Sequence, residues 1–393
     1  MNRLISLRLI REFTKLESSA GIILFGTAVL ALLIDNTPWA HFYEAFFQMK
    51  ISFSVGHFKL EKPLLLWVND GFMSVFFLLV GMEIKREMLQ GELNSISKAM
   101  LPAIAAVGGM IVPILIYLHM NQYDPVGLTG WAIPTATDTA FALAILSMLG
   151  SRIPVTLKIF LTALAIFDDI GAIVVMAIFY SSHVSWALLL CALLLVGLLL
   201  LFNYLGVQEL PAYLIVGVLL WLCVLKSGVH ATLAGIILAA MIPIKNTKDM
   251  GRSPLHVLES KLHPWVAFGI LPLFAFANAG VSFSGMSWHQ LFSPIPLGIA
   301  CGLFFGKQIG IWVATMLGVR LGISQLPKNV TPFGLYAISL VAGVGFTMSL
   351  FIGTLAFHSV PPFAAYVRMG VILGSFFSGL LGYWMLRLAY PKV

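Results

Sequence analysis

Charged residues are scarce in this chain of 393 residues. Asp, Glu, Lys and Arg together make up 10% of the sequence, against about 25% in ordinary soluble domains. Hydrophobic residues make up 60%, and the mean hydropathy is +0.97. A membrane-spanning helix needs about 20 mostly apolar residues. The chain therefore has room for about a dozen spans and no room for a soluble domain of normal size.

Cysteine is scarcer still. Cys191, Cys223 and Cys301 all lie in apolar stretches, with neither a disulfide framework nor a zinc-binding spacing. We expect a protein without a cofactor that is not an enzyme. The basic N-terminal stretch MNRLISLRLIREFTKLESS is followed by no cleavage site, so it predicts a surface helix on the membrane and not a signal peptide.

The net charge of +7 falls in short loops between apolar runs, which indicates membrane lipid and not nucleic acid as the neighbour. Most Lys and Arg residues gather on the side of the N-terminus, which predicts that both termini are cytoplasmic. The opposite side holds only Lys50, Lys59, Lys62, Lys226 and Arg368. Twelve spans give this segregation, at about residues 18–35, 64–84, 100–120, 126–148, 155–181, 185–205, 210–225, 229–244, 262–281, 296–318, 333–357 and 363–389. The whole chain, 1–393, is predicted to be a single integral membrane domain.

The loop at about residues 48–62 differs from the others. Apolar residues alternate with polar ones on both sides of Gly56 and His57, which predicts a small extracytoplasmic β-hairpin. An exposed strand edge can pair with a second copy of itself, so a homodimer is one interpretation. An ordered loop without a partner is the other.

Asp168 and Asp169 are neighbours in the run LKIFLTALAIFDDIGAIVVMAIFY, which is otherwise apolar enough to cross a bilayer. One charge at the bilayer centre costs roughly 2.5–3.5 kcal/mol on insertion scales, and two adjacent carboxylates also repel each other. No packing requirement explains such a pair. We expect it to bind a cation, bind protons, or exchange the two.

Two spans carry breaking or polar residues at mid-depth. Pro134 precedes Thr137 and Asp138 in one, and Gly343 and Gly345 interrupt the other. Irregular backbone at membrane depth persists only where protein or a water-filled cavity satisfies it, and interrupted spans at matching places in two halves of a chain indicate a transporter's site. The matching triplets are inverted repeats at about residues 100–181 and 296–389. A kinked packing helix is the alternative for each span alone.

Lys307 is the one basic residue in the interior of a predicted span, with about ten apolar or small residues on each side. Intramembrane charges usually pair, so we expect it to be the partner of an aspartate. Na+ and Li+ are hard cations that prefer oxygen ligands, which Asp168, Asp169, Thr137 and freed carbonyls supply. Asp138 is predicted to belong to the same group of cation- or proton-binding residues. Because the same carboxylates bind protons, cation and proton compete for one site, as an antiporter requires. Exchange of two protons per Na+, and therefore electrogenic transport, is our hypothesis.

These features resemble the NhaA family of bacterial sodium/proton antiporters. The matching stretches include WAIPTATDTAFAL, LGSRIPVTLKIFLTALAIFDDIGAI, VLKSGVHATLAG and GVGFTMSLFI. The resemblance implies an all-α inner-membrane protein with twelve helices, two crossed discontinuous helices, and a dimer held by the hairpin. It also implies that Asp169 is the more essential cation ligand, that Thr137 and Asp138 lie at the crossing, and that Lys307 pairs with Asp168 or stabilises the crossing.

The resemblance further implies expulsion of Na+ or Li+ with the proton gradient, more actively at alkaline pH. The family's pH-responsive cluster matches five positions here, Glu83, Glu87, His230, Glu259 and His263. Their alternative roles are solvated charges at a helix end for the glutamates and hydrogen-bonded interfacial side chains for the histidines. Ser260 stands where some relatives carry another histidine, which puts the strength of a pH response in doubt.

Three other functions fit these residues less well than antiport. An intramembrane aspartyl protease needs its two aspartates on separate helices, and Asp168 and Asp169 are adjacent. A channel fits poorly, because competition at one deep site suits exchange better than conduction. A sodium-coupled symporter of an organic solute on a related crossed-helix fold stays open, although it would need an additional solute pocket near the crossing.

Overall fold

The computed structural model describes residues 2–55, 58–181, 184–245, 253–283, 288–327, 329–358 and 362–391. Within it the chain divides into two compact units. The first comprises Met1–Pro38, Glu92–Ala172 and Asn278–Val393, and the second comprises Trp39–Gly91 and Ile173–Ala277. Each unit is described by itself, and the expectation of a single membrane domain stays a prediction.

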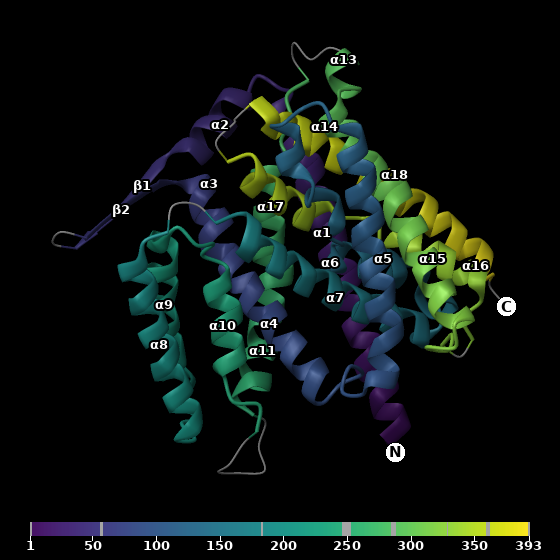
Figure 1. Ribbon diagram of the computed structural model, residues 1–393, viewed down its shortest axis with the longest axis horizontal. Coiled ribbons are helices and arrows are strands. Elements are labelled where there is room, and N and C mark those ends of the chain that lie inside the picture. Colours follow the sequence, from purple (N-terminus) through teal and green to yellow (C-terminus); the bar gives the residue numbers. More distant parts are fainter. Residues whose placement is uncertain are drawn as a thin grey trace. The chain divides into compact units, whose positions relative to one another are not determined.

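The described residues of the first unit form helices joined by turns and loops, with no strand among them (Figure 1). Its α-helices are α1 (Asn2–Asp35), α5 (Ile96–Met120), α6 (Thr139–Leu149), α7 (Val155–Phe179, which ends in the second unit), α13 (Trp288–Leu291), α14 (Pro294–Cys301), α15 (Lys307–Arg320), α16 (Pro332–Val341), α17 (Phe346–Ala356) and α18 (Pro362–Ala389). Short 3-10 turns cover Gly127–Gly130 (η2), Ile133–Thr135 (η3) and Gly150–Arg152 (η4), and a π-helix covers Gly302–Gly306 (η6).

The second unit adds a small sheet to its helices. Its α-helices are α2 (Ala40–Gln48), α3 (Leu64–Leu66), α4 (Met73–Leu89), α8 (Trp186–Tyr204), α9 (Leu210–Ser227), α10 (Leu233–Met241), α11 (Pro254–Trp265) and α12 (Leu271–Asn278), and its π-helices are η1 (Trp67–Phe72) and η5 (Val266–Ile270). Helix α8 packs beside α9, and α10 packs against α4 (Figure 1).

The predicted hairpin is present as a two-stranded antiparallel sheet. Strand β1 (Lys50–Val55) pairs with β2 (Phe58–Pro63), with Phe53 opposite Leu60. Phe53 is exposed and Leu60 is buried, so the pair presents apolar surface to both the molecule and its surroundings. The predicted turn at Gly56 and His57 lies outside the described residues.

Nine helical segments of the described chain are long and apolar enough to cross a membrane, or ten if the bent pair α16 and α17 counts as one span. Two of the twelve predicted spans are not among them. Helix α10, at 229–244, has nine residues, and at 1.5 Å per residue it is too short for a bilayer. The run at 262–281 is helical from Pro254 to Asn278 but passes through the π-helix η5.

The N-terminal segment also differs from expectation. A surface helix was predicted to precede the first span, but α1 runs without a break from Asn2 to Asp35. No helix-breaking residue separates the basic stretch from the apolar one, since Gly21 and Gly26 alone do not stop a helix whose neighbours are good helix formers.

Glycine allows close packing of α5 on α15 in the first unit. A Cβ atom on Gly108 would overlap the carbonyl oxygen of Gly310, and one on Gly310 would overlap that of Gly108. Small residues let helix backbones approach in this way inside membranes. The contact fixes the start of α15, where Lys307 lies fully buried.

Candidate functional site

The first interrupted helix breaks at three residues before α6. Backbone torsions are extended at Ala136 and Asp138, with ψ angles of 150° and 97°. Asp138 is the N-cap of α6, where its Oδ1 accepts a hydrogen bond from the Phe141 N–H at 3.0 Å. A carboxylate at a helix N-terminus both satisfies a free donor and offsets the partial positive charge of the helix dipole.

The second interrupted helix breaks between α16 and α17. Ala342–Gly345 separates the two helices, which are bent by 48° relative to each other. Thr347 and Ser349 follow in the first turn of α17, and both are buried. The interruption expected from Gly343 and Gly345 is therefore present in the structure.

The two breaks are hydrogen-bonded to each other. The Asp138 N–H donates to the Val344 carbonyl at 2.7 Å, and Asp138 Oδ2 accepts from the Thr347 N–H at 3.0 Å and from its hydroxyl at 2.5 Å. The Ser349 hydroxyl donates to the Ile133 carbonyl at 2.8 Å. The buried carboxylate of Asp138 thus accepts hydrogen bonds from the N-termini of both α6 and α17.

Small and rigid residues make this junction compact. A Cβ atom on Gly343 would lie 2.5 Å from the Leu303 carbonyl oxygen, and one on Gly345 would lie 3.0 Å from the Ala136 carbonyl oxygen. Pro134 packs against Gly302, where an added Cβ would come within 2.7 Å. Proline also leaves no N–H to satisfy within this irregular turn.

Asp168 is buried on α7 and is held from two sides. Its Oδ2 accepts a hydrogen bond from the Thr137 hydroxyl at 2.6 Å and forms an ion pair with Lys307 Nζ. The side chains of Asp168 and Lys307 are both fully inaccessible to solvent. Among the described residues, Asp168 Oδ1 has no hydrogen-bond partner. Asp169, the next residue on α7, is 5% exposed.

The Thr137 hydroxyl lies between two acceptors. It is 2.6 Å from Asp168 Oδ2 and 2.8 Å from the Ala342 carbonyl oxygen at the second break. A hydroxyl carries one proton and two lone pairs, so it donates fully to only one of them. If it donates to Ala342, its lone pairs are left facing the Asp168 carboxylate.

The comparisons with known proteins cover nearly the whole chain. The family model described as "Na+/H+ antiporter 1" matches residues 11–386. The chain belongs to the NhaA family of Na+/H+ antiporters. It is similar to the "Na(+)/H(+) antiporter NhaA" of Rhodospirillum rubrum, at 54% identity over 98% of each chain. It is also similar to "NhaA 1" of Syntrophotalea carbinolica, at 52% identity over 98% of this chain and 97% of the relative.

NhaA membership and the nine or more apolar helices make this a multi-pass membrane protein of a transporter family. Within the part of the chain that the structure describes, no group of three or more His, Cys, Asp or Glu side chains could hold a metal ion. A cation at Asp168 and Asp169 would therefore complete its ligand shell with hydroxyl, carbonyl or water oxygens. Oxygen ligands of these kinds are the ones that hard cations prefer.

The residues matching the NhaA pH-responsive cluster fall into separate places in the second unit. Arg86 lies 3.1 Å from Glu87 and 3.2 Å from Glu259, and it is within electrostatic range of His263. Burial raises the pKa of the Glu259 carboxyl, against the opposing charge of Arg86. Glu83 lies one turn before Glu87 on α4. These groups therefore gather where α4 meets α11.

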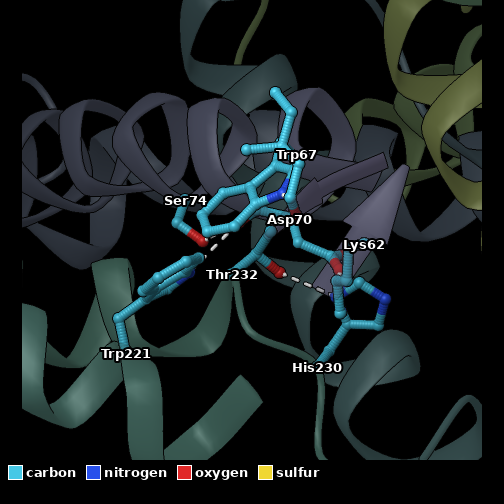
Figure 2. Close-up of polar contacts among 8 residues, drawn as sticks. Lys62, Trp67, Asp70, Ser74, Trp221, His230 and Thr232 are labelled. Atoms are coloured by element: carbon cyan, nitrogen blue, oxygen red, sulfur yellow. Dashed lines mark hydrogen bonds and ion pairs between the residues drawn. The ribbon is translucent and has the colours of Figure 1, made fainter. Parts of the chain in front are cut away.

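His230 lies at the other end of α10 from that group. Lys85 donates to the carbonyls of Ala240 and Ile242 at the C-terminal end of α10, whereas His230 precedes its N-terminal end and contacts the Thr232 hydroxyl at 3.3 Å. Figure 2 draws His230 beside Lys62 and Thr232. The structure thus separates His230 from Glu87 and Glu259 by the length of α10.

A second polar group lies beside His230 in Figure 2. Lys62 of β2 forms an ion pair of 2.7 Å with Asp70 in the π-helix η1. The carbonyl of Asp70 accepts from the Trp221 indole at 3.2 Å and from the Ser74 hydroxyl at 2.5 Å. These contacts connect the hairpin, η1 and α9 within the second unit.

Sequence reasoning missed two features next to Lys307. The π-helix η6 ends at Gly306, directly before Lys307, and Gln308 hydrogen-bonds to Tyr336 of α16. An amide next to a lysine inside an apolar span was the available signal for Gln308. Nothing in the sequence indicated its partner, because the register of α15 on α16 is a property of the packed structure.

Proposed function

We propose that this chain exchanges Na+ for protons, the activity for which its relatives are named. The observation that supports the site is the buried contact of Asp168 with Thr137 and Lys307 at the junction of two interrupted helices. This contact combines carboxylate and hydroxyl oxygens for a hard cation with an ammonium that occupies the same carboxylate. Li+ has the same ligand preference and is expected as a second substrate.

The exchange follows from competition at Asp168 and Asp169. In the cation-free state, Lys307 neutralises Asp168. An arriving Na+ takes the two carboxylates and the Thr137 oxygen, and the displaced ammonium, buried without its partner, releases its proton because burial disfavours an unpaired charge. A second proton leaves the carboxylate pair. Two protons per Na+ move one net charge, so transport is electrogenic.

The proposed architecture is the twelve-helix one of the family. Its two discontinuous helices, whose second halves are α6 and α17, cross at Asp138. The inverted repeats are residues 100–181 and 296–389, and alternating access reorients the site between the two faces of a bacterial inner membrane. Both termini lie in the cytoplasm, since the basic residues gather on the side of the N-terminus.

Two further properties belong to the proposal. Glu83, Glu87, Glu259 and His263 regulate transport by pH through the group around Arg86, and His230 acts separately. The hairpin holds a homodimer, since β1 carries the exposed apolar residues Ile51 and Phe53. Symport of an organic solute is not favoured, because the relatives are named antiporters.

The test is Na+-induced proton movement in everted membrane vesicles from about pH 6.5 to about pH 9. We expect flux in the wild type, its loss in Asp169→Asn, and its retention in the control Asp124→Asn. In proteoliposomes, an imposed potassium diffusion potential should change the rate, because about 2.3 kcal/mol acts on one charge per 100 mV.

Each result bears on a different part of the proposal. Wild-type vesicles without sodium-dependent proton movement would contradict antiport. Full activity in Asp169→Asn would place the site elsewhere, and a rate indifferent to the diffusion potential would contradict electrogenic exchange. Sodium flux that requires an organic solute would support the symporter.

A further inference from the structure

Gln308 follows Lys307 in α15 and uses both ends of its amide. The side chain is 4% exposed. Its Nε2 donates to the Phe304 carbonyl at 2.6 Å, and its Oε1 accepts a hydrogen bond from the Tyr336 hydroxyl of α16. A polar side chain this deeply buried is costly unless its hydrogen bonds are made.

The Phe304 carbonyl belongs to the π-helix that ends directly before Lys307. In this segment the Lys307 N–H bonds to the Gly302 carbonyl, five residues back. A π-turn inserts an extra residue into an α-helix and is often found at functional sites. The widened turn shifts the backbone pairing, and the Gln308 amide supplies a donor to one of its carbonyls. Gln308 therefore supports the turn from which Lys307 projects.

A second contact links the same two helices one turn further along. The Trp312 indole donates to the Pro332 carbonyl at 3.2 Å, and the rings of Trp312 and Tyr336 meet edge to face at 6.3 Å. The pairs 308 with 336 and 312 with 332 run antiparallel. Before the start of α15 the same antiparallel register brings Leu303 close to Gly343, which packs on the Leu303 carbonyl.

Helix α16 thus connects the Gln308 contact to the second break. The Ala342 carbonyl, just past the end of α16, accepts from the Thr137 hydroxyl. Thr137 and Lys307 both reach Asp168 Oδ2. The hydrogen bond between Gln308 and Tyr336 therefore closes a loop of contacts that includes Thr137, Asp168 and Lys307.

We infer that Gln308 and Tyr336 are positioning residues that hold Lys307 against Asp168 and so set how strongly the ammonium competes with Na+. The inference rests on the proposed function. It extends that function, because neither residue touches the carboxylates or a bound cation.

The surroundings of Lys307 make its position decisive. Helix α7 presents Asp168 and Asp169, the charged groups that act on the ammonium. Helix α5 presents Gly109, where an added Cβ would lie 3.7 Å from Lys307 Cδ, and the only titratable residue of α16 is Tyr336. Among the described residues, the only counter-charge of Lys307 is this carboxylate pair. Lys307 therefore competes less strongly with Na+ for the carboxylates once the hydrogen bond between Gln308 and Tyr336 no longer holds α15.

The test measures the pH profile and the sodium dependence of exchange in proteoliposomes for Tyr336→Phe and Gln308→Met. For each variant we expect the apparent KM for Na+ near pH 7 to fall about threefold, the scale of one hydrogen bond. The pH of half-maximal exchange should move about 0.5 unit toward acid, with kcat within about twofold. The double variant should match Gln308→Met, since that substitution already removes the bond to Tyr336 together with the bond to the Phe304 carbonyl.

Trp312→Phe is the matched control, because it removes the contact one turn away from Lys307. It should keep the wild-type pH profile. A uniform loss of rate in Tyr336→Phe with an unchanged pH midpoint would show a merely structural role and overturn the inference, as would an equal shift in Trp312→Phe. If the wild type itself moves no protons with Na+, the proposed function fails; if it does and the variants keep its midpoint, only this inference fails.

Discussion

Thr137 shows how one hydroxyl can serve two states of the site. It lies within hydrogen-bond distance of both Asp168 Oδ2 and the Ala342 carbonyl oxygen, but it has a single proton. In the proposed exchange it donates to the carboxylate when the cation is absent, and it donates to the carbonyl and offers a lone pair to the cation when the cation is present. The residue can therefore adapt to either occupant without moving its backbone.

Thr137→Val tests this role with little change of shape. We expect the apparent KM for Na+ to rise about tenfold or more, because a hydrogen bond to a charged group contributes about 1.5–3 kcal/mol. The measurement is sodium-dependent exchange in proteoliposomes. Thr315→Val is the matched control, since Thr315 is equally buried on α15 but donates only to the Ile311 carbonyl of its own helix. Equal KM values for the two variants would argue against a cation-facing Thr137.

The charged residues of the site were predictable one by one from the sequence. Asp168, Asp169 and Lys307 are ionisable side chains in runs that otherwise suit a bilayer, and the cost of burying each demands a function or a partner. Gln308 was not predictable in the same way. An amide in an apolar span is less costly than a charge, and its partner Tyr336 is 28 positions away.

At the scale of elements, the two interrupted helices depend on glycine where their breaks meet. Gly345→Ala would place a Cβ atom 2.7 Å from Leu303 Cδ2 and 3.0 Å from the Ala136 carbonyl oxygen. We expect a loss of about 1–3 kcal/mol of stability, typical of overpacking, measured as a lower unfolding temperature in detergent. Gly197→Ala in α8 is the control, since its Cβ would meet nothing within 4 Å. Equal effects in the two variants would contradict tight packing at the junction.

Pro134, Gly343 and Gly345 made both breaks predictable, because proline and glycine act on the backbone locally. The π-helices η1, η5 and η6 were not. A π-turn changes the spacing of the backbone hydrogen bonds without needing a different amino-acid composition. Which carbonyl loses its usual donor therefore depends on the neighbouring helices. The side-chain donor of Gln308 illustrates this dependence.

The contact between α4 and α11 gives a pH prediction. Burial raises the pKa of Glu259, with Arg86 opposing. A carboxyl whose pKa rises on folding binds its proton more tightly in the folded protein. Its contribution to stability is therefore present below the unfolded pKa and is lost as pH rises through the folded pKa. Glu259→Gln should gain stability relative to the wild type as pH increases.

Thermal unfolding in detergent between about pH 4.5 and about pH 8 measures this difference. Glu92→Gln is the control, because Glu92 forms an exposed ion pair with Lys98, and exposed pairs contribute little. The control should differ from the wild type by the same amount at each pH. A Glu259→Gln variant that loses stability as pH rises would show that the ion pair with Arg86 outweighs the cost of burial.

At the scale of the whole molecule, composition indicated a membrane protein with many spans but did not determine their number. Hydropathy and charge segregation predicted twelve spans, and the described residues hold nine or ten segments that meet a length and hydropathy criterion. The short helix α10 and the interrupted run through α11, η5 and α12 account for the difference.

The hairpin allows a prediction about assembly. Phe53 is 57% exposed on β1, although its cross-strand partner Leu60 is buried. If this face pairs with a second copy of the chain, Phe53→Lys should convert the dimer to monomer, since a lysine at a strand edge opposes pairing and an unpaired interfacial charge costs several kcal/mol. Size-exclusion chromatography with light scattering reports the mass. Phe42→Lys, on α2, changes an exposed phenylalanine outside the hairpin and should stay dimeric. A Phe53→Lys dimer would move the interface away from the hairpin, and loss of the dimer in both variants would show that added charge alone separates the subunits.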